Sequence, residues 1–281
     1  MATGWGRNFN LPGRTGLEER RERLYLCLLA KTFKQQFVYR SDLFFRTLGG
    51  ILRLYIQVCI WTALLAQGAA EVTLTEMVTY IVVASLLTGL THSTISYTLA
   101  ERVRQGTIAL DLIRPVDLRT YLLCTQLSEN LFSLLFSSLP VVSVAVLVWG
   151  VIWPTLPNLL LFLLSTGLAV LLMFLIEYAI GLLVFWVKDG VYTDFLIHGL
   201  FTIFSGTTIP LWFYPEFLAK IAYRLPFRLI TFEPISIYLG RYQWEESLRV
   251  IIWQCLWIAI FFLLAVLIWR MIQKSIFIQG G

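Results

Sequence analysis

The sequence predicts an all-α, polytopic membrane protein with six transmembrane helices, preceded by an interfacial elbow helix. Of its 281 residues, 58% are hydrophobic and 14% are charged, whereas charged residues make up about 25% of an ordinary soluble domain. The mean hydropathy is +0.76. The apolar residues gather in runs that suit a hydrocarbon core of about 30 Å, or roughly 20 residues of helix. We therefore treat residues 1–281 as a single transmembrane domain.

The first partly apolar segment is expected to lie on the membrane rather than to cross it. Residues 17–40 read LEERRERLYLCLLAKTFKQQFVYR, in which leucine and phenylalanine recur at helical spacing among charged residues. Nine Lys and Arg residues precede Gly49, which suits a helix in the inner headgroup layer. The first sixteen residues hold no apolar core of the kind a signal peptide needs. Residues 1–46 are therefore predicted to be a retained, cytosolic N-terminus that includes the elbow helix.

Six spans are predicted after this segment. They lie at residues 48–68, 77–99, 122–150, 157–187, 193–212 and 248–270. Outside the spans, sixteen Lys and Arg residues fall on the side of the N-terminus and four on the opposite side. Because an excess of basic residues marks the cytosolic side of a membrane protein, both termini are predicted to be cytosolic.

Composition and motifs argue against several other classes of protein. The net charge of +5 comes from basic residues near span ends, where lipid headgroups account for them, so no nucleic-acid partner is expected. The cysteines form no CxxC pair and no Cys/His cluster, so neither a disulfide framework nor a metal site is expected: they are Cys27, Cys59, Cys124 and Cys255. We find no catalytic grouping and no GxxxxGK[ST] loop, so the chain is not expected to be an enzyme that hydrolyses ATP.

The longest charged island between the spans, residues 100–121, is expected to be a cytosolic loop. Gly106 and Pro115 bracket a segment, residues 107–114, that is long enough for about two turns of helix. Its apolar side chains share one face, with Asp111 on the opposite flank: they are Ile108, Ala109, Leu112 and Ile113. Nothing within the loop covers that face, so it is expected to meet either lipid headgroups or a partner protein.

The third external loop, residues 205–246, differs from the other two. Its four prolines forbid one long helix, and its Trp and Tyr residues prefer a membrane interface. The prolines are Pro210, Pro215, Pro226 and Pro234. We expect short, broken helices that re-enter the outer leaflet. Non-helical backbone at that depth must be buried in protein or line a cavity, so the loop is expected either to cap a transport pathway or to lie as an interfacial hairpin.

Glu177 is the strongest candidate for a residue of a transport pathway. It lies about 15 Å along a helix from the nearest cytosolic loop, which places it close to the bilayer midplane. Ionisable groups at that depth generally serve a substrate path or a gate, and the alternative is a structural bond to a neighbouring helix. Glu129 and Arg53 lie nearer the cytosolic span ends and can reach the interface. His92 and His198 are expected to be packing residues.

Four stretches give the chain a resemblance to the ABC-2 type permeases, the six-span membrane subunits of bacterial ABC exporters. They read RQGTIALDLIRPVDLRTY, SGTTIPLWFYPEFLAKIAYRLPF, EPISIYLG and IQGG, and the resemblance covers nearly the whole chain. The pattern GxxxxxLxRP between the second and third spans is specific in that context. The resemblance implies an elbow helix, a coupling helix between the second and third spans, a re-entrant loop before the sixth span and a dimer of membrane subunits.

The resemblance also assigns residues by position. The ATPase-coupling residues would be Gly106, Thr107, Ile108, Leu112, Ile113, Arg114 and Pro115. The external gate would include Ser205, Gly206 and Pro210, and Glu177 joins them from the argument about buried charge. The coupling helix would dock on a separate nucleotide-binding subunit that holds the ATP and Mg²⁺, so this chain is expected to carry no cofactor of its own.

The hypothesis that follows is a permease subunit of an ATP-binding cassette exporter in the bacterial cytoplasmic membrane. It would be surrounded by lipid and paired with a second permease, identical or different. Aromatic-rich walls and one buried carboxylate favour an amphipathic or hydrophobic substrate that moves outward. The alternative is a stand-alone channel or secondary carrier, in which Glu177 and His92 would bind or titrate the transported ion.

Overall fold

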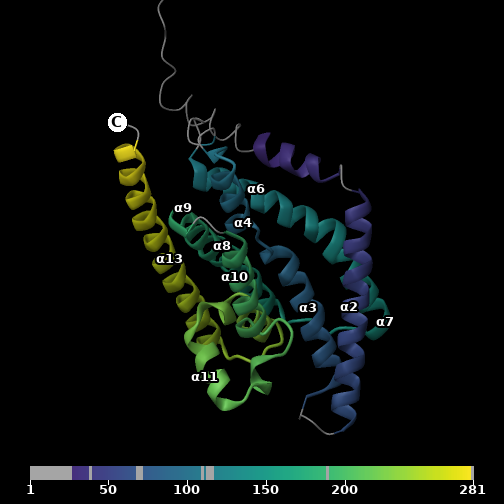
Figure 1. The fold of residues 1–281 in the computed structure, drawn as a ribbon. Helices are drawn as coiled ribbons and strands as arrows, with labels where there is room; N and C mark the ends of the chain where they lie inside the picture. The colour runs from purple at the N-terminus through teal and green to yellow at the C-terminus, as the bar shows by residue number, and fades with distance from the viewer. Residues whose placement is uncertain are drawn as a thin grey trace, which may run out of the picture.

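The computed structural model describes residues 27–37, 40–67, 72–108, 111, 117–187 and 190–279. In this part of the chain every regular element is a helix (Figure 1), so the all-α prediction is confirmed. The principal helices are α2 (Arg40–Ala66), α3 (Leu74–Thr91), α4 (Ile95–Arg104), α6 (Leu118–Ser133), α7 (Leu139–Trp149), α8 (Leu156–Leu182), α9 (Val184–Val187), α10 (Gly190–Phe204) and α13 (Trp244–Gln279).

Five helical stretches are long and apolar enough to cross a membrane, among the residues that the structure describes. They are Leu43–Ala66, Leu74–Arg104, Leu118–Trp149, Leu156–Trp186 and Trp244–Gln273. The predicted fifth span, residues 193–212, corresponds to α10, which has 15 residues and is therefore about 22 Å long. It ends at Phe204 because the chain turns at Gly206, which has a φ of 76°. A multi-pass helical protein is confirmed, and the sixth span stays a prediction.

The second span consists of two helices. α3 is capped by Thr73, whose side-chain oxygen accepts a hydrogen bond from the N–H of Glu76 at 3.2 Å. It ends at Thr91, and after a short non-helical stretch α4 begins at Ile95 and continues toward the predicted coupling segment. Neither Pro nor Gly stands between Thr91 and Ile95, so the usual sequence signal for an interrupted helix is missing.

The third span also departs from a regular α-helix. Between α6 and α7 the chain forms a π-helical segment, Leu134–Ser138. α3 crosses this segment at Gly89, where an added Cβ would lie 2.1 Å from Oγ of Ser138. Two helices can approach this closely only where one of them has no side chain. Gly89 therefore sets the position of α3 against the third span.

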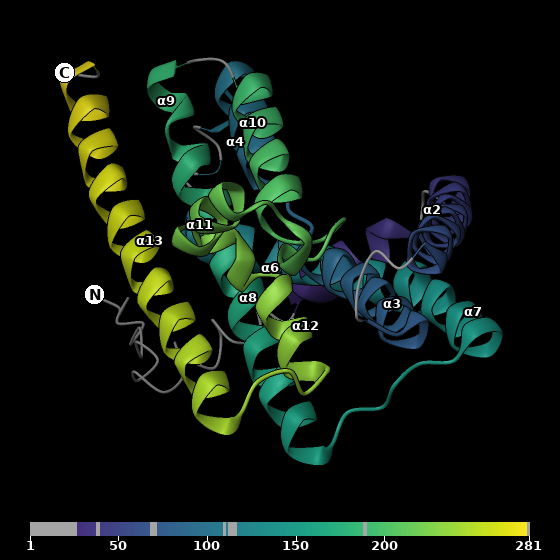
Figure 2. The ribbon, with the colours of Figure 1, turned by 90° about the horizontal axis from the view of Figure 1, so that it is seen from below.

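α8 is the central helix of the bundle. It packs against α13, α4, α12 (Phe232–Tyr238) and α10. Leu172 of α8 belongs to a core cluster shared with α3 and the external loop, and Leu182 belongs to a second cluster shared with α4, α6 and α13. A third cluster, around Met77, lies between α2, α3 and α7. Figure 2 shows this division, with α2, α3 and α7 on one side of the bundle and α8, α12 and α13 on the other.

The external loop is built of short helices, as its prolines predict. They are a 3₁₀ turn at Leu211–Phe213, α11 (Glu216–Arg224), a 3₁₀ turn at Pro226–Leu229 and α12. The residues from Phe232 to Ile237 are all buried, and α12 packs against α8 and α3. Gln254 of α13 is fully buried and donates hydrogen bonds to the carbonyls of Ser165 and Leu229 at 3.0 and 2.9 Å. The loop is thereby joined to two spans, and its depth in the outer leaflet stays a prediction.

Residues 27–36 form a helix that lies across the upper end of α2 in Figure 1. Phe33 and Phe37 pack edge-on against the ring of Phe132 in α6, at centroid distances of 5.4 and 5.0 Å. The helix falls within the predicted elbow, of which residues 17–26 lie outside the described part of the chain. Its crosswise direction fits an interfacial elbow, and its place in the headgroup layer stays a prediction.

Candidate functional site

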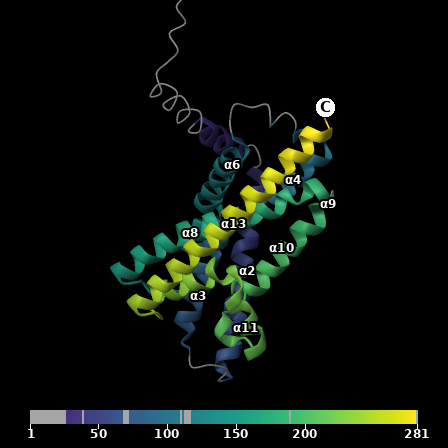
Figure 3. The ribbon, with the colours of Figure 1, turned by 90° about the vertical axis from the view of Figure 1, so that its left-hand side faces the viewer.

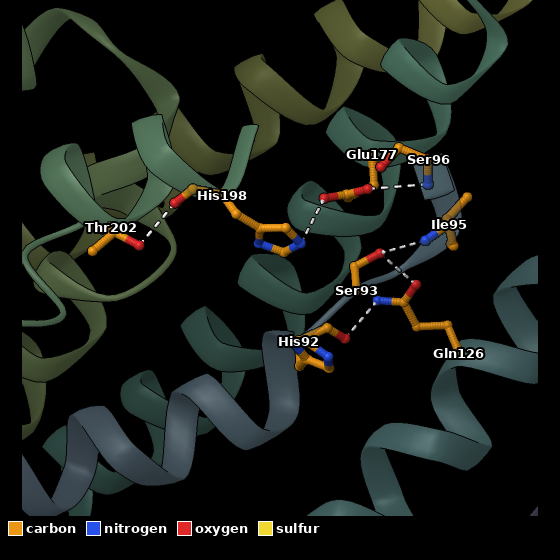
Figure 4. A network of polar contacts seen from close by, with 8 residues as sticks. All are labelled: His92, Ser93, Ile95, Ser96, Gln126, Glu177, His198 and Thr202. Atoms are coloured by element: carbon orange, nitrogen blue, oxygen red, sulfur yellow. Dashed lines mark hydrogen bonds and ion pairs between the residues drawn. The ribbon is translucent and has the colours of Figure 1, made fainter. Parts of the chain in front are cut away.

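The break between α3 and α4 gathers polar side chains from several helices (Figure 4). Gln126 of α6 donates from Nε2 to the carbonyl of His92 at 3.1 Å, and its Oε1 accepts from Oγ of Ser93 at 2.8 Å. Asn130, one turn along α6, donates to the carbonyl of Leu90 at 2.5 Å. These bonds satisfy backbone and hydroxyl groups that an interrupted helix leaves without helical partners. α6 therefore stabilises the break.

Glu177 of α8 holds the start of α4. Its side chain is fully buried, and Oε2 accepts a hydrogen bond from the N–H of Ser96 in the first turn of α4, at 3.1 Å. A negative charge at a helix N-terminus interacts favourably with the helix dipole, and the interaction is stronger where water is excluded. At Gly181, one turn further along α8, an added Cβ would lie 3.0 Å from Cα of Ser96. Charge and close packing together fix this end of α4 against α8.

Two histidines lie next to Glu177. Nε2 of His198 in α10 is 3.9 Å from Oε1 of Glu177, and the rings of His92 and His198 stack at a centroid distance of 6.0 Å. The side chain of His198 is 33% exposed, whereas that of Glu177 is 0% exposed. His92 is exposed and His198 is partly exposed, so neither is a buried packing residue, and the two rings connect α3, α8 and α10 at the break.

Three small cavities lie along α3 and meet these side chains. The first has a volume of about 220 Å³, and Arg46, Glu129 and His92 contribute to its wall. The second, of about 120 Å³, shares His92 and adds His198 and Thr207. The third, of about 100 Å³, shares Thr207 and lies between α2 and α3. The cavities form an interrupted row from the break to the external loop, with His92 and Thr207 at its two junctions.

The other end of α4 leads into the predicted coupling segment. α4 ends at Arg104, and Gly106 turns the chain with a φ of 71°. Nη1 of Arg102 donates to Oδ2 of Asp111 at 2.7 Å, and Asp111 is buried. Asp111 therefore ties the segment to α4. The sequence places Asp111 on the flank opposite the apolar face, and the structure adds that its partner comes from the preceding helix.

Only part of the coupling segment falls within the described residues. Thr107 is exposed, and Ile108 is half-buried against the core cluster of α4, α6, α8 and α13. The chain itself therefore covers part of the Ile108 side chain. The remaining predicted coupling residues lie outside the described part of the chain: Leu112, Ile113, Arg114 and Pro115. Their role in ATPase coupling stays a prediction.

The predicted gate residues lie at the end of α10, where the chain turns into the external loop. Ser205 is fully buried, and its carbonyl accepts from the N–H of Phe232 in α12 at 3.0 Å. The carbonyl of Gly206 accepts from the hydroxyl of Tyr80 in α3 at 2.6 Å. An added Cβ at Gly206 would lie 3.0 Å from Cβ of Phe232. Pro210 is buried and precedes a short 3₁₀ turn. α3, α10 and α12 meet at this turn, and its role as a gate stays a prediction.

Polar contacts tie the external loop to α3 and α10. The hydroxyl of Tyr214, which lies outside the candidate spans, donates to the carbonyl of Ile203 at 2.5 Å. Burial raises the pKa of the Tyr214 phenol, so the hydroxyl keeps its proton and remains a donor. Arg241 pairs with Glu76 of α3 at 2.6 Å and lies over the ring of Trp212 at 3.9 Å. The loop is therefore connected to α3 and α10, two of the helices that border the row of cavities.

Gln126 and Asn130 are site residues that the sequence analysis did not single out. They lie four residues apart in α6, a spacing that places both amides on one face of the helix. That spacing of two amide side chains within a predicted span is the available signal. No group of three or more His, Cys, Asp or Glu residues placed to hold a metal occurs in the ranges that the structure describes. The arrangement is suited to hold α4 against α8 rather than to perform covalent chemistry.

Comparisons with known proteins point to one family. The model of a family described as "ABC-2 family transporter protein" matches residues 57–280 of this chain. The matched region includes the last ten residues of α2, the break, the coupling segment, α8, α10, the external loop and α13. A search of curated proteins found no match.

Proposed function

The chain belongs to the ABC-2 family of transporters, and from this premise we propose that it is the permease subunit of an ATP-driven exporter. It moves an amphipathic or hydrophobic substrate outward across the membrane. ATP and Mg²⁺ are bound by a separate nucleotide-binding subunit, since the sequence holds no GxxxxGK[ST] loop. Membership of the family supports a role as a membrane transport component rather than as an enzyme. The positions of α4 and α10 support the ATP-driven part of the proposal.

The observation that carries the proposal is the position of α4. This helix has ten residues and spans about 15 Å. One end continues into the segment proposed to dock on the ATPase, through Arg102 and Asp111. The other end meets Glu177, and Glu177 meets His198 of α10. α10 in turn ends at Phe204, directly before Ser205 of the proposed gate. A displacement of the docking segment is therefore passed to the gate through two helices in direct contact.

The break gives this transmission a hinge. A ten-residue helix moves largely as a rigid body, whereas the three residues between Thr91 and Ile95 belong to neither helix. The helical hydrogen bonds that reach them run from the N–H of His92 back to α3 and from α4 back to the carbonyl of Thr94. ATP-driven movement of the docking segment turns α4 about these residues. Because Ser96 stays bonded to Glu177, the turn moves Glu177 with the start of α4 and thereby moves His198 and α10. Glu177 thus acts in the gating role that the sequence suggests for it.

The small volumes of the three cavities support a closed state of the proposed transport path. Their volumes are about 220, 120 and 100 Å³, below the range of about 300–1,000 Å³ that drug-sized ligands occupy. Opening between α2, α3 and α10 joins the cavities through His92 and Thr207. The resulting passage has charged groups at Arg46, Arg53 and Glu129 and further polar side chains at each cavity, and apolar residues such as Leu43, Met173 and Ile81 lie between them. This mixed lining suits an amphipathic molecule.

The proposed subunit lies in the bacterial cytoplasmic membrane, with both termini in the cytosol. Only 17% of the most apolar window of α2 is buried within the chain, and the same share holds for α13, against 56% for the second and fourth candidate spans. Apolar helices with so little internal cover need lipid or another protein around them. A second permease, identical or different, and membrane lipid supply that cover.

The test is to charge the apolar face of the docking segment. Each of Ile108 and Leu112 would contribute about 1.5–3 kcal/mol if fully buried against an ATPase, and about 1.4 kcal/mol is tenfold in affinity. We expect the double variant Ile108→Asp, Leu112→Asp to insert in the membrane but to lose the ATPase on purification and to stop export. Co-purification of the subunits and export from inverted vesicles measure both.

The control is Trp153→Asp, which also replaces an apolar side chain with aspartate, on an exposed residue in the connection before α8. Trp153→Asp should retain the ATPase in full. Because Ile108 also packs against the core of the chain itself, the unfolding temperature of the double variant must be recorded as well. A correctly folded double variant that keeps a stoichiometric ATPase and exports normally would show that the face lies on lipid.

The contact of Glu177 with His198, and of His198 with His92, favours a second candidate, a stand-alone channel or secondary carrier. A carboxylate beside histidines is a common arrangement for proton or cation coupling in membranes. Ion flux into vesicles that hold only the purified chain, without ATP, distinguishes the two functions. Flux that Glu177→Gln abolishes would support the carrier.

A further inference from the structure

A large groove lies on the outer side of the first cavity, with which it shares Asn130 in its wall. It has a volume of about 850 Å³ and lies between the helix at residues 27–36, the end of α3, α6 and α8. Figure 3 shows the side on which α6 and α8 run in different directions. The groove is lined mainly by apolar side chains, and three of them at its edges are exposed on the surface: Leu127, Leu131 and Leu163. The groove therefore opens toward the hydrocarbon of the membrane.

The groove is open because α8 presents small residues there. At Gly167 an added Cβ would have no other atom within 4 Å, although the residue lies in the middle of a long helix. Further along α8, Gly181 has backbone of α4 at 3.0 Å. The two glycines of α8 thus have different effects. Gly181 allows the backbone of α4 to approach α8 closely, whereas Gly167 leaves the groove open.

Thr166, next to Gly167, supplies an unusual polar group in this wall. Its side chain is 7% exposed, and its Oγ1 has no hydrogen-bond partner among the residues that the structure describes. Other threonines in helices of this chain donate to the carbonyl four residues earlier: Thr62, Thr79, Thr88, Thr91, Thr125 and Thr202. A buried hydroxyl without a partner is unfavourable. The unpaired hydroxyl of Thr166 therefore indicates that a ligand with a hydrogen-bond acceptor binds in the groove.

The cytosolic edge of the groove carries a positive charge. Lys34 lines it from the helix at residues 27–36 and is exposed. Basic residues of a helix on the cytosolic surface attract anionic headgroups, at about 1 kcal/mol for each charge near the surface. The groove thus combines an apolar wall, one buried donor and one cation at its edge.

We propose that this groove binds one anionic glycerophospholipid of the cytosolic leaflet. An acyl chain lies between α6 and α8, an ester carbonyl accepts the hydrogen bond of Thr166, and the phosphate lies next to Lys34. The apolar lining suits the acyl chain, the ester supplies the acceptor that Thr166 lacks, and the phosphate matches the charge of Lys34. The site is separate from the proposed gate and does not depend on ATP-driven export.

Occupation of the groove would fix the helix at residues 27–36 to α6 and α8. That helix already touches α6 through Ser128, whose Oγ donates to the carbonyl of Leu29 at 3.2 Å. α8 reaches the groove with Gly167 and Val170, and its later residues include Glu177. Bound lipid should therefore stabilise the whole cytosolic half of the bundle, because a ligand that binds only the folded state raises the unfolding temperature.

The test measures lipid binding by the full-length protein in detergent. The protein is stripped of lipid and titrated with phosphatidylglycerol or with phosphatidylcholine of the same acyl chains, and native mass spectrometry counts the bound molecules. Parent protein should prefer phosphatidylglycerol. Gly167→Leu should weaken phosphatidylglycerol binding about tenfold or more, since leucine occupies the space of the acyl chain. Lys34→Gln should reduce the preference for phosphatidylglycerol about fivefold. Thr166→Val should weaken both lipids about threefold.

Each variant has a matched control outside the groove. Gly49→Leu changes an exposed glycine of α2 that also has open space, Lys31→Gln removes a charge from the same helix as Lys34, and Thr62→Val removes a bonded hydroxyl. All three should bind lipid as the parent does. Lys34→Gln alters a surface charge and keeps the test valid if Gly167→Leu fails to fold.

Three outcomes would overturn the proposal. Equal affinity of the parent for the two lipids would remove the role of Lys34. Unchanged phosphatidylglycerol binding by a folded Gly167→Leu would show that lipid lies elsewhere. A Gly167→Leu protein that binds lipid normally but changes from dimer to monomer would assign the groove to an interface between two copies of the chain.

Discussion

The two ends of α4 are held by different kinds of interaction. At the N-terminal end, the N–H of Ser96 bonds to the fully buried carboxylate of Glu177, and the backbone lies against Gly181. At the C-terminal end, Arg102 pairs with Asp111, and the side chain of Arg102 is 23% exposed. One end is enclosed by α8, whereas the other lies near the surface.

This difference assigns separate tasks to the two ends. Buried charge interactions are strong and are screened little by salt, whereas pairs near the surface are weaker and salt-dependent. The N-terminal end of α4 is therefore the fixed end, held by Glu177 and Gly181. The C-terminal end, at Arg102, is the one that moves with the coupling segment. The variants below change the fixed end first and the surface end last.

The largest effect is expected for Gly181→Ala. The new Cβ would lie 2.8 Å from Cδ1 of Leu99 and 3.0 Å from Cα of Ser96, and a backbone atom cannot give way unless α4 moves. We expect a loss of about 1–3 kcal/mol in the free energy of unfolding, measured by denaturation in detergent. Gly167→Ala, on the same helix but with open space around it, should instead be neutral or stabilising by up to about 1 kcal/mol. Similar losses in both variants would mean that α4 does not lie against Gly181.

Glu177→Gln should have the next largest effect. Glutamine keeps an acceptor for the N–H of Ser96 but removes the charge at the start of α4, so we expect a loss of about 1–2 kcal/mol in stability. The assembled complex should keep its basal ATPase activity and lose the stimulation produced by a panel of amphipathic dyes. Glu216→Gln, which alters an exposed carboxylate of α11, serves as the control. A Glu177→Gln complex with full stimulation would exclude a gating role.

A smaller effect is expected at the other end, for Asp111→Asn. Arg102 and Asp111 form a partly exposed pair, so a double-mutant cycle with Arg102→Gln should give a coupling energy of about 0.5–1 kcal/mol. This coupling energy should fall as salt is raised. The functional loss should exceed the loss of stability, because the pair joins the coupling segment to α4: ATPase activity remains and export declines. Normal export by Asp111→Asn would contradict the proposed transmission of movement from the coupling segment to α4.

The smallest effect is expected for Glu101→Gln. Glu101 pairs with Arg104 at 2.7 Å on the surface of α4, and Arg104 is 71% exposed. Exposed pairs of this kind contribute little, so unfolding temperature and export should match those of the parent. A clear loss of export with unchanged stability would extend the coupling surface to this face of α4.

Periodicity and hydropathy located the spans well. The sequence predicts the fourth span at residues 157–187, and the candidate span is Leu156–Trp186. The predicted fifth span extends to residue 212, beyond the end of α10 at Phe204, because apolar residues continue after that helix. Leu211 is apolar for another reason, since it is fully buried in the core cluster beneath the external loop. A hydropathy average cannot separate a side chain that faces lipid from one that is buried by a loop.

The break in the second span could not be predicted in the same way. Its partners come from distant parts of the chain: Gln126 lies 33 residues from Ser93, and Glu177 lies 81 residues from Ser96. The residues of the break carry no helix-breaking signal of their own. The interruption forms because neighbouring helices offer side chains that satisfy the exposed backbone groups, which an apolar surrounding requires.

The sequence by itself determined the class of the protein, most of its spans, the short helices of the external loop and its resemblance to a transporter family. These properties follow from hydrophobic runs, charge bias and proline positions, which are local and additive along the chain. Only the tertiary structure decided what Glu177, Asp111 and Thr166 contact. Where water is excluded, the role of a polar group depends on which neighbouring group forms a hydrogen bond or ion pair with it. For Glu177 and Asp111 that neighbour belongs to α4, whereas Thr166 has no neighbour of that kind within the described residues.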